Sequence, residues 1–206
     1  MSTLSKFQQW WINALPHRIH IKRYIPKLLR RSPEPFRGEV LEVGAGRGWT
    51  SRQVLETFPQ VELTASDINP NISRTFARLQ QHYGSRLRFK QADLLNLPFD
   101  RSSFDIVIGA HVMHHIKAPD QAIRQMLRVL RPGGLLGLTN QNQYYIVGPL
   151  KLLWRPTTLI SRPDLEAIIK REGAEIVISE GDAHFIIWAR KPYPVKPDTK
   201  KITSTV

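Results

Sequence analysis

The fold is decided by residues 40–48 of the 206-residue chain, which read VLEVGAGRG. The first four of them, residues 40–43, predict a short buried strand. Gly44, Gly46 and Gly48 follow at alternate positions, and glycine lets the backbone turn tightly and approach a ligand closely. Residues 49–57 then predict a helix. A strand, a glycine turn and a helix in this order are typical of the cofactor-binding turn of doubly wound α/β proteins.

The rest of the chain continues this alternation of strands and helices. Further strands are predicted over residues 61–66, 87–91, 104–109, 135–139, 175–179 and 185–189. Further helices are predicted over residues 70–82, 119–130 and 162–172, the second ended by Pro132-Gly133-Gly134 and the third capped by Ser161. The alternation predicts an α/β fold with a doubly wound, mostly parallel sheet that helices cover on both faces.

The length and composition are those of a single globular domain. Domains usually have about 100–200 residues, and hydrophobic residues make up 41% of the chain, which is enough for an ordinary core. The absence of cysteine excludes disulfides, thiolate zinc sites and a cysteine nucleophile, and no metal site is predicted. No stretch reaches the roughly 18 apolar residues of a membrane-spanning helix, and the N-terminus lacks the compact apolar core of a secretory signal. We therefore expect a cytoplasmic protein.

The net charge of +13 is concentrated at the two ends of the chain. Residues 1–37 contain eight Lys or Arg and one acidic residue, and residues 190–206 contain five and one. The predicted organisation is a basic amphipathic N-terminal helical segment over residues 1–37, a nearly neutral domain over residues 38–191 and a basic flexible tail over residues 192–206. Basic ends favour anionic partners such as lipid head groups or nucleic acid, although solvated tails also increase solubility.

The N-terminal segment has the pattern of an amphipathic helix. Residues 4–15 place Leu4, Phe7, Trp11 and Leu15 on one helical face. Aromatic residues interleaved with basic ones resemble an element that lies on an anionic membrane surface, which predicts peripheral membrane contact. A helical lid that packs on the domain without touching a membrane is the alternative. The proline-containing stretch SPEPF that follows predicts a linker.

The spacing of the glycines distinguishes between classes of cofactor. The dinucleotide fingerprint is G-x-G-x-x-G, and its last position here is Trp49, so the fit to NAD or FAD is imperfect. A phosphate-binding loop is excluded because no Gly-Lys-Ser/Thr follows. Glu42 stands just before the glycines, where its negative charge would disfavour a pyrophosphate. A ligand that carries an ammonium group and a sulfonium would be favoured by the same charge.

Two further acids follow the next two predicted strands. Asp67 ends the second strand, 19 residues after Gly48, where an acid can accept hydrogen bonds from both ribose hydroxyls. Asp93 ends the third strand and can accept from an adenine amino group, with the backbone of Leu94 beside it. Because ligands of such sheets bind outside the carboxyl ends of the strands, we expect these features to meet at one edge.

With these residues in place, the chain resembles the class I S-adenosylmethionine-dependent methyltransferases. It is most similar to the small-molecule, type 11 group that includes the ubiquinone/menaquinone-biosynthesis C-methyltransferases. The segments that carry the resemblance are VLEVGAGRG, ASDIN around Asp67, QADLLNLPF around Asp93, FDIVIGAHVMHHI and VLRPGGLL. They extend over residues 38–190 and are specific for the cofactor but not for the substrate.

The resemblance implies a Rossmann-like, seven-stranded sheet whose last strand is antiparallel. It implies the cofactor S-adenosyl-L-methionine and the product S-adenosyl-L-homocysteine. The chain departs from the family's common pattern at Arg47, which replaces a small or polar residue between the last two glycines of the motif. The residues implied to line the cofactor site are Glu42, Gly44, Ala45, Gly46, Gly48, Asp67, Ile68, Asp93, Leu94 and Ala110.

Histidines after the fourth strand are candidates for a catalytic base. His111 and His115 would face the methyl group, and a histidine can take a proton from a hydroxyl or an acidic carbon. The alternative is a structural role, which we also expect for His114, and His184 is a weaker candidate of the same kind. Methyl transfer does not strictly need a base, because in-line positioning of the nucleophile can supply much of the acceleration.

The acceptor side is predicted from segments outside these motifs. Residues 140–160 are rich in apolar and aromatic side chains, which suits a small hydrophobic acceptor such as a prenylated quinol, or a lid. Packing of these side chains against the N-terminal helix is the alternative interpretation. The apolar and aromatic residues of this segment are Tyr144, Tyr145, Leu150, Leu152, Leu153 and Trp154.

Two rival functions stay open at this point. Methylation of RNA or DNA is favoured by the basic ends, but residues 38–189 are nearly neutral and lack the Asn/Asp-Pro-Pro-Tyr pattern of base amino methylation. The absence of cysteine also excludes the covalent route to 5-methylcytosine. The second rival is a non-catalytic protein that binds S-adenosylmethionine and a partner. Methyl transfer to a small acceptor is the leading hypothesis.

Overall fold

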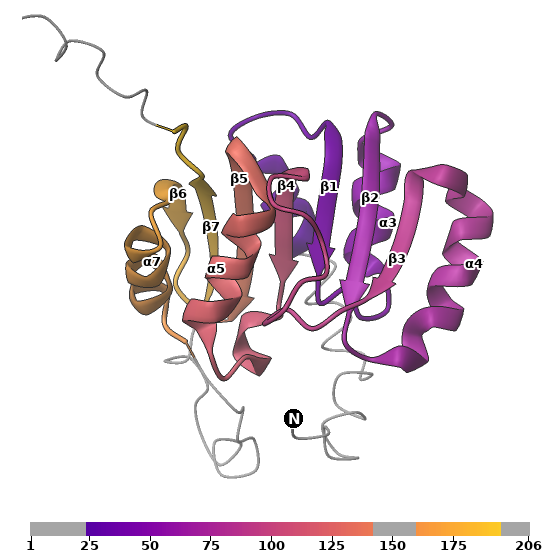
Figure 1. The fold of residues 1–206 in the computed structure, drawn as a ribbon. Coiled ribbons are helices and arrows are strands. Elements are labelled where there is room, and N and C mark those ends of the chain that lie inside the picture. The colour runs from indigo at the N-terminus through magenta and orange to yellow at the C-terminus, as the bar shows by residue number, and fades with distance from the viewer. Residues whose placement is uncertain (1–23, 142–159, 195–206) are drawn as a thin grey trace, which may run out of the picture.

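A computed structural model describes residues 24–141 and 160–194 (Figure 1). An unlabelled helix covers residues 24–30. The labelled helices are α3 (Trp49–Thr57), α4 (Ser73–Tyr83), α5 (Pro119–Val129) and α7 (Arg162–Arg171), with short 3-10 turns η1 (Pro70–Ile72), η2 (Gly84–Arg86) and η3 (Met113–His115). The strands are β1 (Gly38–Val43), β2 (Val61–Asp67), β3 (Leu87–Gln91), β4 (Phe104–Ala110), β5 (Leu130–Gln141), β6 (Glu175–Glu180) and β7 (His184–Arg190).

The strands form one seven-stranded sheet in the order β3-β2-β1-β4-β5-β7-β6. Pairs from β3 to β5 are parallel, and β7 is antiparallel to both of its neighbours. The predicted α/β fold with an antiparallel last strand is therefore confirmed. This order brings the carboxyl ends of the parallel strands to one edge of the sheet. Because β7 runs the other way, its first residue, His184, lies at the same edge and pairs with Gln141.

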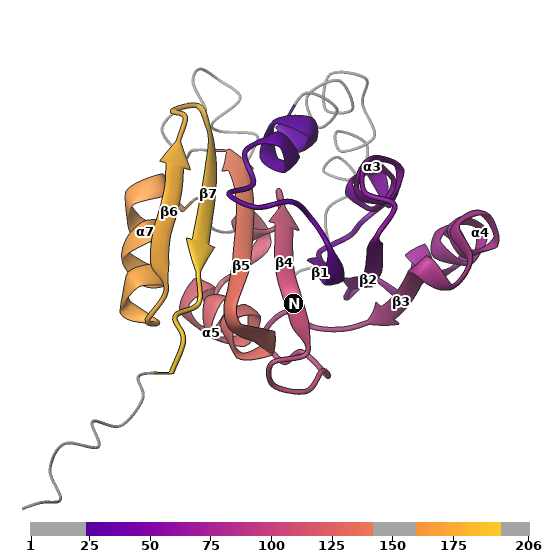
Figure 2. The same cartoon turned by 90° about the horizontal axis from the view of Figure 1, so that it is seen from above.

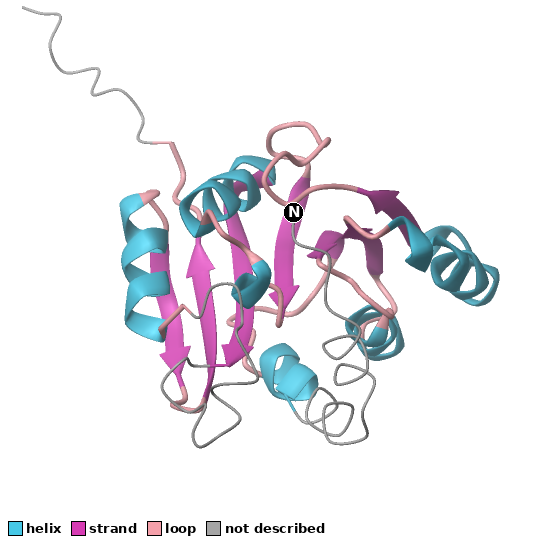
Figure 3. Cartoon of the chain, turned by 90° about the horizontal axis from the view of Figure 1, so that it is seen from below, coloured by secondary structure: helices cyan, strands magenta, loops and turns pink. Residues whose placement is uncertain are grey.

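Helices cover both faces of the sheet. Figure 2 shows α3 and the helix over residues 24–30 on one side and α5 and α7 on the other, and Figure 3 shows the same layers from below. Alternation of side chains along each strand produces a core on each face. In β4, Val107 packs in the core beneath α5, whereas Ile106 and Ile108 pack in the core beneath α3. Within the described ranges, no helix is long and apolar enough to cross a bilayer.

Residues 24–36 pack into the same core as the strands. Leu28 is fully buried, and its carbonyl accepts a hydrogen bond from the Trp188 indole across 3.2 Å. Phe36 stacks on Phe58 and meets Trp188 edge to face. The stretch predicted as a linker therefore carries a core side chain. Residues 1–23 of the predicted N-terminal segment and residues 195–206 of the predicted tail lie outside the described residues.

The start of β5 differs from the prediction. Pro132-Gly133-Gly134 was expected to precede a strand beginning at residue 135, but β5 already begins at Leu130. The three residues form an irregularity inside the strand, where the register with β4 shifts between Phe104 and Ile106. The amide of Gly133 donates to the Lys191 carbonyl, and the Lys191 amide donates to the Gly134 carbonyl. Pairing with a segment distant in sequence thus overrides the local turn signal.

The predicted helix over residues 70–82 is also divided. Its first turn is the 3-10 turn η1, in which the Asn69 side chain accepts from the Asn71 amide and Pro70 occupies the first position. The α-helix α4 begins only at Ser73. The other predicted elements lie within one or two residues of the observed ones, and α3 matches its prediction at both ends.

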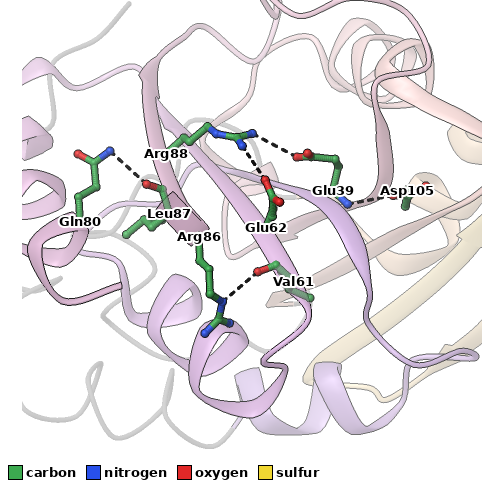
Figure 4. Close-up of polar contacts among 8 residues, drawn as sticks. All are labelled: Glu39, Val61, Glu62, Gln80, Arg86, Leu87, Arg88 and Asp105. Carbon is green, nitrogen blue, oxygen red and sulfur yellow. Dashed lines mark hydrogen bonds and ion pairs between the residues drawn. The ribbon is translucent and has the colours of Figure 1, made fainter. Parts of the chain in front are cut away.

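At the amino edge of the sheet, two arginines that lie two residues apart have different partners (Figure 4). Arg86 is half-buried and donates to the carbonyls of Val61, Leu55 and Phe58 at 3.3, 3.0 and 2.9 Å. It thereby satisfies carbonyls at the end of α3 that the helix itself leaves without partners. Arg88 is exposed and pairs with the carboxylates of Glu39 and Glu62.

We predict that Arg86→Ala destabilises the protein more than Arg88→Ala does. Loss of charge-assisted bonds to half-buried carbonyls should cost about 1.5–3 kcal/mol, whereas loss of exposed ion pairs should cost about 0–1 kcal/mol. Urea denaturation of both variants measures the difference. Equal losses would contradict the assignment of Arg86 as the residue that anchors the end of α3.

Candidate cofactor site

The glycine loop lies at the carboxyl edge of the sheet, between β1 and α3. Gly44, Gly46 and Gly48 have φ angles of +69°, +50° and +75°, in the left-handed region that favours glycine. A Cβ atom on Gly44 would lie 2.4 Å from a methyl group of Val112, and one on Gly48 would lie 2.6 Å from a methyl group of Leu79. A Cβ atom on Gly46 would meet nothing within 4 Å. The loop is therefore packed at its two ends and faces open space at its centre.

Asp67 connects this loop to the end of β2. One of its carboxylate oxygens accepts a hydrogen bond from the Gly46 amide across 2.8 Å, and the other accepts from the Asn69 amide across 2.9 Å. The Ala45 amide donates to the Ser66 carbonyl beside it. The side chain of Asp67 is half-buried. The acid predicted to bind ribose hydroxyls thus lies directly at the loop.

Asp93 lies at the next strand end. The Ala92 amide donates to the Asp67 carbonyl across 2.9 Å, so the two acids follow adjacent, paired segments. One carboxylate oxygen of Asp93 accepts from the Leu95 amide across 2.9 Å, which fixes the turn. Leu94 is buried, whereas the side chain of Ile68 is 40% exposed. The structure therefore brings the loop, both acids and Ile68 to one edge, as the sequence predicts.

The chemistry of this edge fits S-adenosylmethionine. The half-buried carboxylate of Asp67 contacts Gly46, above which there is open space, and the half-buried carboxylate of Asp93 follows the neighbouring strand. Such acceptors suit a ligand that offers hydroxyl and amino hydrogens. A pyrophosphate would instead meet two negative charges. Arg47, the only basic residue of the loop, is exposed. The site thus favours a neutral or cationic ligand over a dinucleotide.

Glu42 lies beneath the loop and is buried, with 1% of its surface exposed. Its carboxylate accepts a hydrogen bond from the Ser51 hydroxyl in the first turns of α3. Burial raises the pKa of Glu42 to about 8; the negative charge of Asp67 acts in the same direction, whereas hydrogen bonds from Ser51 and Thr50 oppose it. Its predicted contact with the ammonium group of the ligand stays a prediction, and its bond to Ser51 ties β1 to α3.

The segment after β4 contacts the loop. Ala110 ends the strand half-buried, and Val112 packs on Gly44. His111 adopts a left-handed φ of +55°, and its amide donates to the Thr139 carbonyl across 2.8 Å. Its ring lies 5.8 Å from that of His184. Of the two predicted bases, His111 is the one that directly precedes the residue packed on the loop.

The other histidines of this segment have different surroundings. The Nδ1 atom of His114 lies 2.9 Å from the amide oxygen of Asn140, so His114 has a structural contact, as expected. The His115 side chain is exposed, with its ring 3.9 Å from that of His114. The catalytic roles predicted for His111 and His115 stay predictions. Tyr24, which stacks on His184, was missed as a residue of this edge, whereas the buried Asn140 is the first residue of the acceptor segment predicted over residues 140–160.

Comparison with known proteins agrees with this geometry. Residues 40–134 match the family model described as "Methyltransferase domain". The chain is 35% identical over 100 residues to the ubiquinone/menaquinone biosynthesis C-methyltransferase UbiE of Hahella chejuensis, covering 47% of this chain and 40% of that protein. It is 27% identical over 131 residues to the hybrid PKS-NRPS synthetase lepA of Aspergillus flavus, covering 59% of this chain and 3% of that protein. The chain thus spans less than half the length of each of these relatives.

A solved structure has the same fold. Phosphoethanolamine N-methyltransferase 2 of Haemonchus contortus, in complex with S-adenosyl-L-methionine, matches with a TM-score of 0.72 and 18% identity, covering 82% of this chain and 52% of that one. Residues 40–134 thus resemble a methyltransferase domain, and the described residues share the fold of this solved methyltransferase.

We predict that Glu42 makes the folded protein less stable as the pH rises. Between its ordinary pKa of 4.5 and the folded value of about 8, the folded state holds a proton that the unfolded state releases. Stability should therefore fall through this window by up to about 1.4 kcal/mol per pH unit. Glu42→Gln cannot titrate, so the variant should gain stability relative to the wild type between about pH 5 and about pH 8.

Urea denaturation of both proteins across this window measures the effect. The control is Glu62→Gln, because Glu62 is an exposed acid of β2. If the stability difference between Glu42→Gln and the wild type did not change with pH, the result would contradict the burial of an ionisable Glu42.

Proposed function

We propose that this protein transfers a methyl group from S-adenosylmethionine to a small hydrophobic acceptor. The observation that carries the proposal is the loop centred on Gly46, which faces open space and is held by Asp67. When bound, S-adenosylmethionine supplies an electrophilic methyl group. The acceptor's electron pair forms the new bond to this methyl group, and the electron pair of the broken C–S bond leaves with S-adenosylhomocysteine. The acceptor also loses a proton.

The residues of the loop edge bind and orient the cofactor in this proposal. Asp67 accepts hydrogen bonds from the ribose hydroxyls, and Asp93 with the Leu94 backbone recognises the adenine amino group. The exposed side chain of Ile68 offers an apolar surface to the adenine ring. The ends of β2 and β3 thus fix the nucleoside, which leaves the methyl group near the segment after β4. Holding the two reactants in line supplies much of the acceleration.

His111 is the favoured proton acceptor. It follows β4 directly and adjoins Val112, the residue that packs on the loop at Gly44. His115 is exposed, three residues beyond that contact, so it is less suited to a role at the methyl group. An imidazole can accept the acceptor's proton near neutral pH.

A hydrophobic acceptor is supported by two observations. UbiE, which matches residues of this domain, is named for the biosynthesis of ubiquinone and menaquinone. The helix over residues 24–30 also ends at exposed Arg30, whereas the following Arg31 pairs with Glu180. The charge of Arg30 would favour peripheral contact with an anionic membrane, where a lipid-like acceptor resides. Residues 142–159, which make up most of the acceptor segment predicted over residues 140–160, lie outside the described residues.

Incubation with radiolabelled methyl donor and fractionated cell extract tests the proposal. We expect label in the lipid fraction, and we expect Asp67→Ala to reduce incorporation at least about tenfold, since it loses a charged hydrogen-bond partner of the cofactor. Asp100→Ala, an exposed acid away from the loop, should behave as the wild type. Label in RNA would replace the proposal with nucleic-acid methylation, and no incorporation would favour a protein that binds the cofactor without turnover.

A further inference from the structure

Three basic side chains follow the strands that end beside the cofactor loop. Arg47 lies in the loop after β1, Arg74 lies in the first turn of α4 after β2, and Lys117 lies between η3 and α5 after β4. All three side chains are exposed. Because β1, β2 and β4 are parallel neighbours, the segments that follow them lie at one edge of the sheet (Figure 1). We call Arg47, Arg74 and Lys117 the edge cations.

The edge cations have no acidic partner in the part of the chain that the structure describes. The segments that carry them, residues 44–48, 68–74 and 111–118, contain no Asp or Glu. The acids that follow β2 and β3 accept hydrogen bonds from backbone amides, Asp67 from Gly46 and Asp93 from Leu95. The charge of the edge cations is therefore not neutralised by a neighbouring carboxylate.

Two arginines at the opposite, amino edge of the sheet have acidic partners instead. Arg88 pairs with Glu39 and Glu62 (Figure 4). Arg131 pairs with Asp105 across 2.6 Å. Exposed arginines that hold neighbouring strands together thus have carboxylates within reach. The edge cations form no such pairs, so the stability of the fold does not explain their placement.

Two of the edge cations are also placed unfavourably with respect to helices. Arg74 is the second residue of α4, and no acidic residue occupies the first turn of this helix. Arg47 lies two residues before α3, whose first turn likewise contains no acidic residue. The amino end of a helix carries a partial positive charge, so a cation there is disfavoured. Local arrangements that work against stability are expected at functional surfaces.

We propose that the edge cations bind this edge of the protein to an anionic phospholipid surface. The inference rests on the proposed function, because a lipid-like acceptor resides in the bilayer and contact through this edge turns the cofactor loop toward it. The proposal goes beyond a contact at Arg30, because it names the edge that faces the membrane. Anionic head groups attract each basic side chain that lies near them.

Lipid head groups fit the edge cations better than a single-stranded nucleic acid does. Proteins that bind single strands stack the bases on aromatic side chains. The three segments that carry the edge cations contain no Phe, Tyr or Trp. A lipid surface requires only that the charges lie on one side of the protein, which the parallel strand ends provide.

Sedimentation of the full chain with vesicles tests the proposal. The vesicles contain phosphatidylcholine either alone or mixed with phosphatidylserine, and we expect binding only to the mixed vesicles. One variant combines Arg47→Gln, Arg74→Gln and Lys117→Gln. Its partition coefficient on the mixed vesicles should be at least about tenfold lower than that of the wild type, since each cation near such a surface contributes about fivefold.

The matched control removes the same charge from the amino edge. It combines Arg37→Gln, Arg101→Gln and Lys170→Gln, three exposed residues that precede β1, precede β4 and lie in the last turn of α7. Charges that far from the bound surface are screened by salt, so binding should change by less than about twofold. Circular dichroism and urea denaturation of both variants check that they fold as the wild type does.

Single fluorescent labels test the orientation in an otherwise wild-type chain. The protein contains no cysteine, so one introduced thiol carries the only label. Asn71→Cys places a polarity-sensitive dye at the exposed start of α4, and Asp100→Cys places it at the amino edge. Anionic vesicles should shift the emission of the label at position 71 to shorter wavelength and leave that of the label at position 100 unchanged.

Four results would overturn the proposal. They are absence of wild-type binding to anionic vesicles, equal loss of binding in the two combined variants, unchanged binding of the edge-cation variant, and an emission shift at position 100 rather than at position 71. Binding of RNA in preference to vesicles, lost in the edge-cation variant, would also overturn it and assign the surface to nucleic acid. Failure of the wild type to bind S-adenosylmethionine would instead contradict the proposed function, because vesicle binding does not require the cofactor.

Discussion

The hydrogen bond from the Gly46 amide to the Asp67 carboxylate is the interaction on which the rest of the site depends. It joins the end of β2 to a loop that has no side chains of its own to hold it at Gly44, Gly46 or Gly48. With its other oxygen Asp67 accepts from the Asn69 amide, so one carboxylate orients both the loop and the start of η1. The same bond fixes the backbone at Gly46, where a Cβ atom would meet nothing within 4 Å.

Much of the fold could be predicted because its signals are local. The boundaries of α3 follow from the glycine that precedes it, and the cap of α7 follows from Ser161, which accepts from the Asp164 amide. The start of β5 could not be predicted in this way. Pro132-Gly133-Gly134 is a turn signal when considered alone, and only the bonds of Gly133 and Gly134 with Lys191 convert it into an irregular strand.

The difference between local signals and contacts distant in sequence applies to the candidate site as well. The loop, Asp67 and Asp93 were predictable because parallel strands place their carboxyl ends at one edge, so three local motifs converge without further information. The burial of Glu42 beneath α3 and the stacking of Tyr24 on His184 were not predictable. The N-terminal segment, which includes Tyr24, was interpreted either as a membrane-surface element or as a helical lid, and neither interpretation predicts that the Tyr24 ring packs on His184, 160 residues later. Contacts of that range depend on the complete fold.

Calorimetric titration of three proteins tests the claim that the loop centred on Gly46 binds S-adenosylmethionine. Gly46 and Gly173 both have positive φ angles, and a Cβ atom on either would meet nothing within 4 Å, but only Gly46 belongs to the loop. The wild type and Gly173→Ala should bind S-adenosylmethionine alike, and Gly46→Ala should bind at least about tenfold more weakly. No binding by the wild type, or equal binding by Gly46→Ala, would contradict the claim.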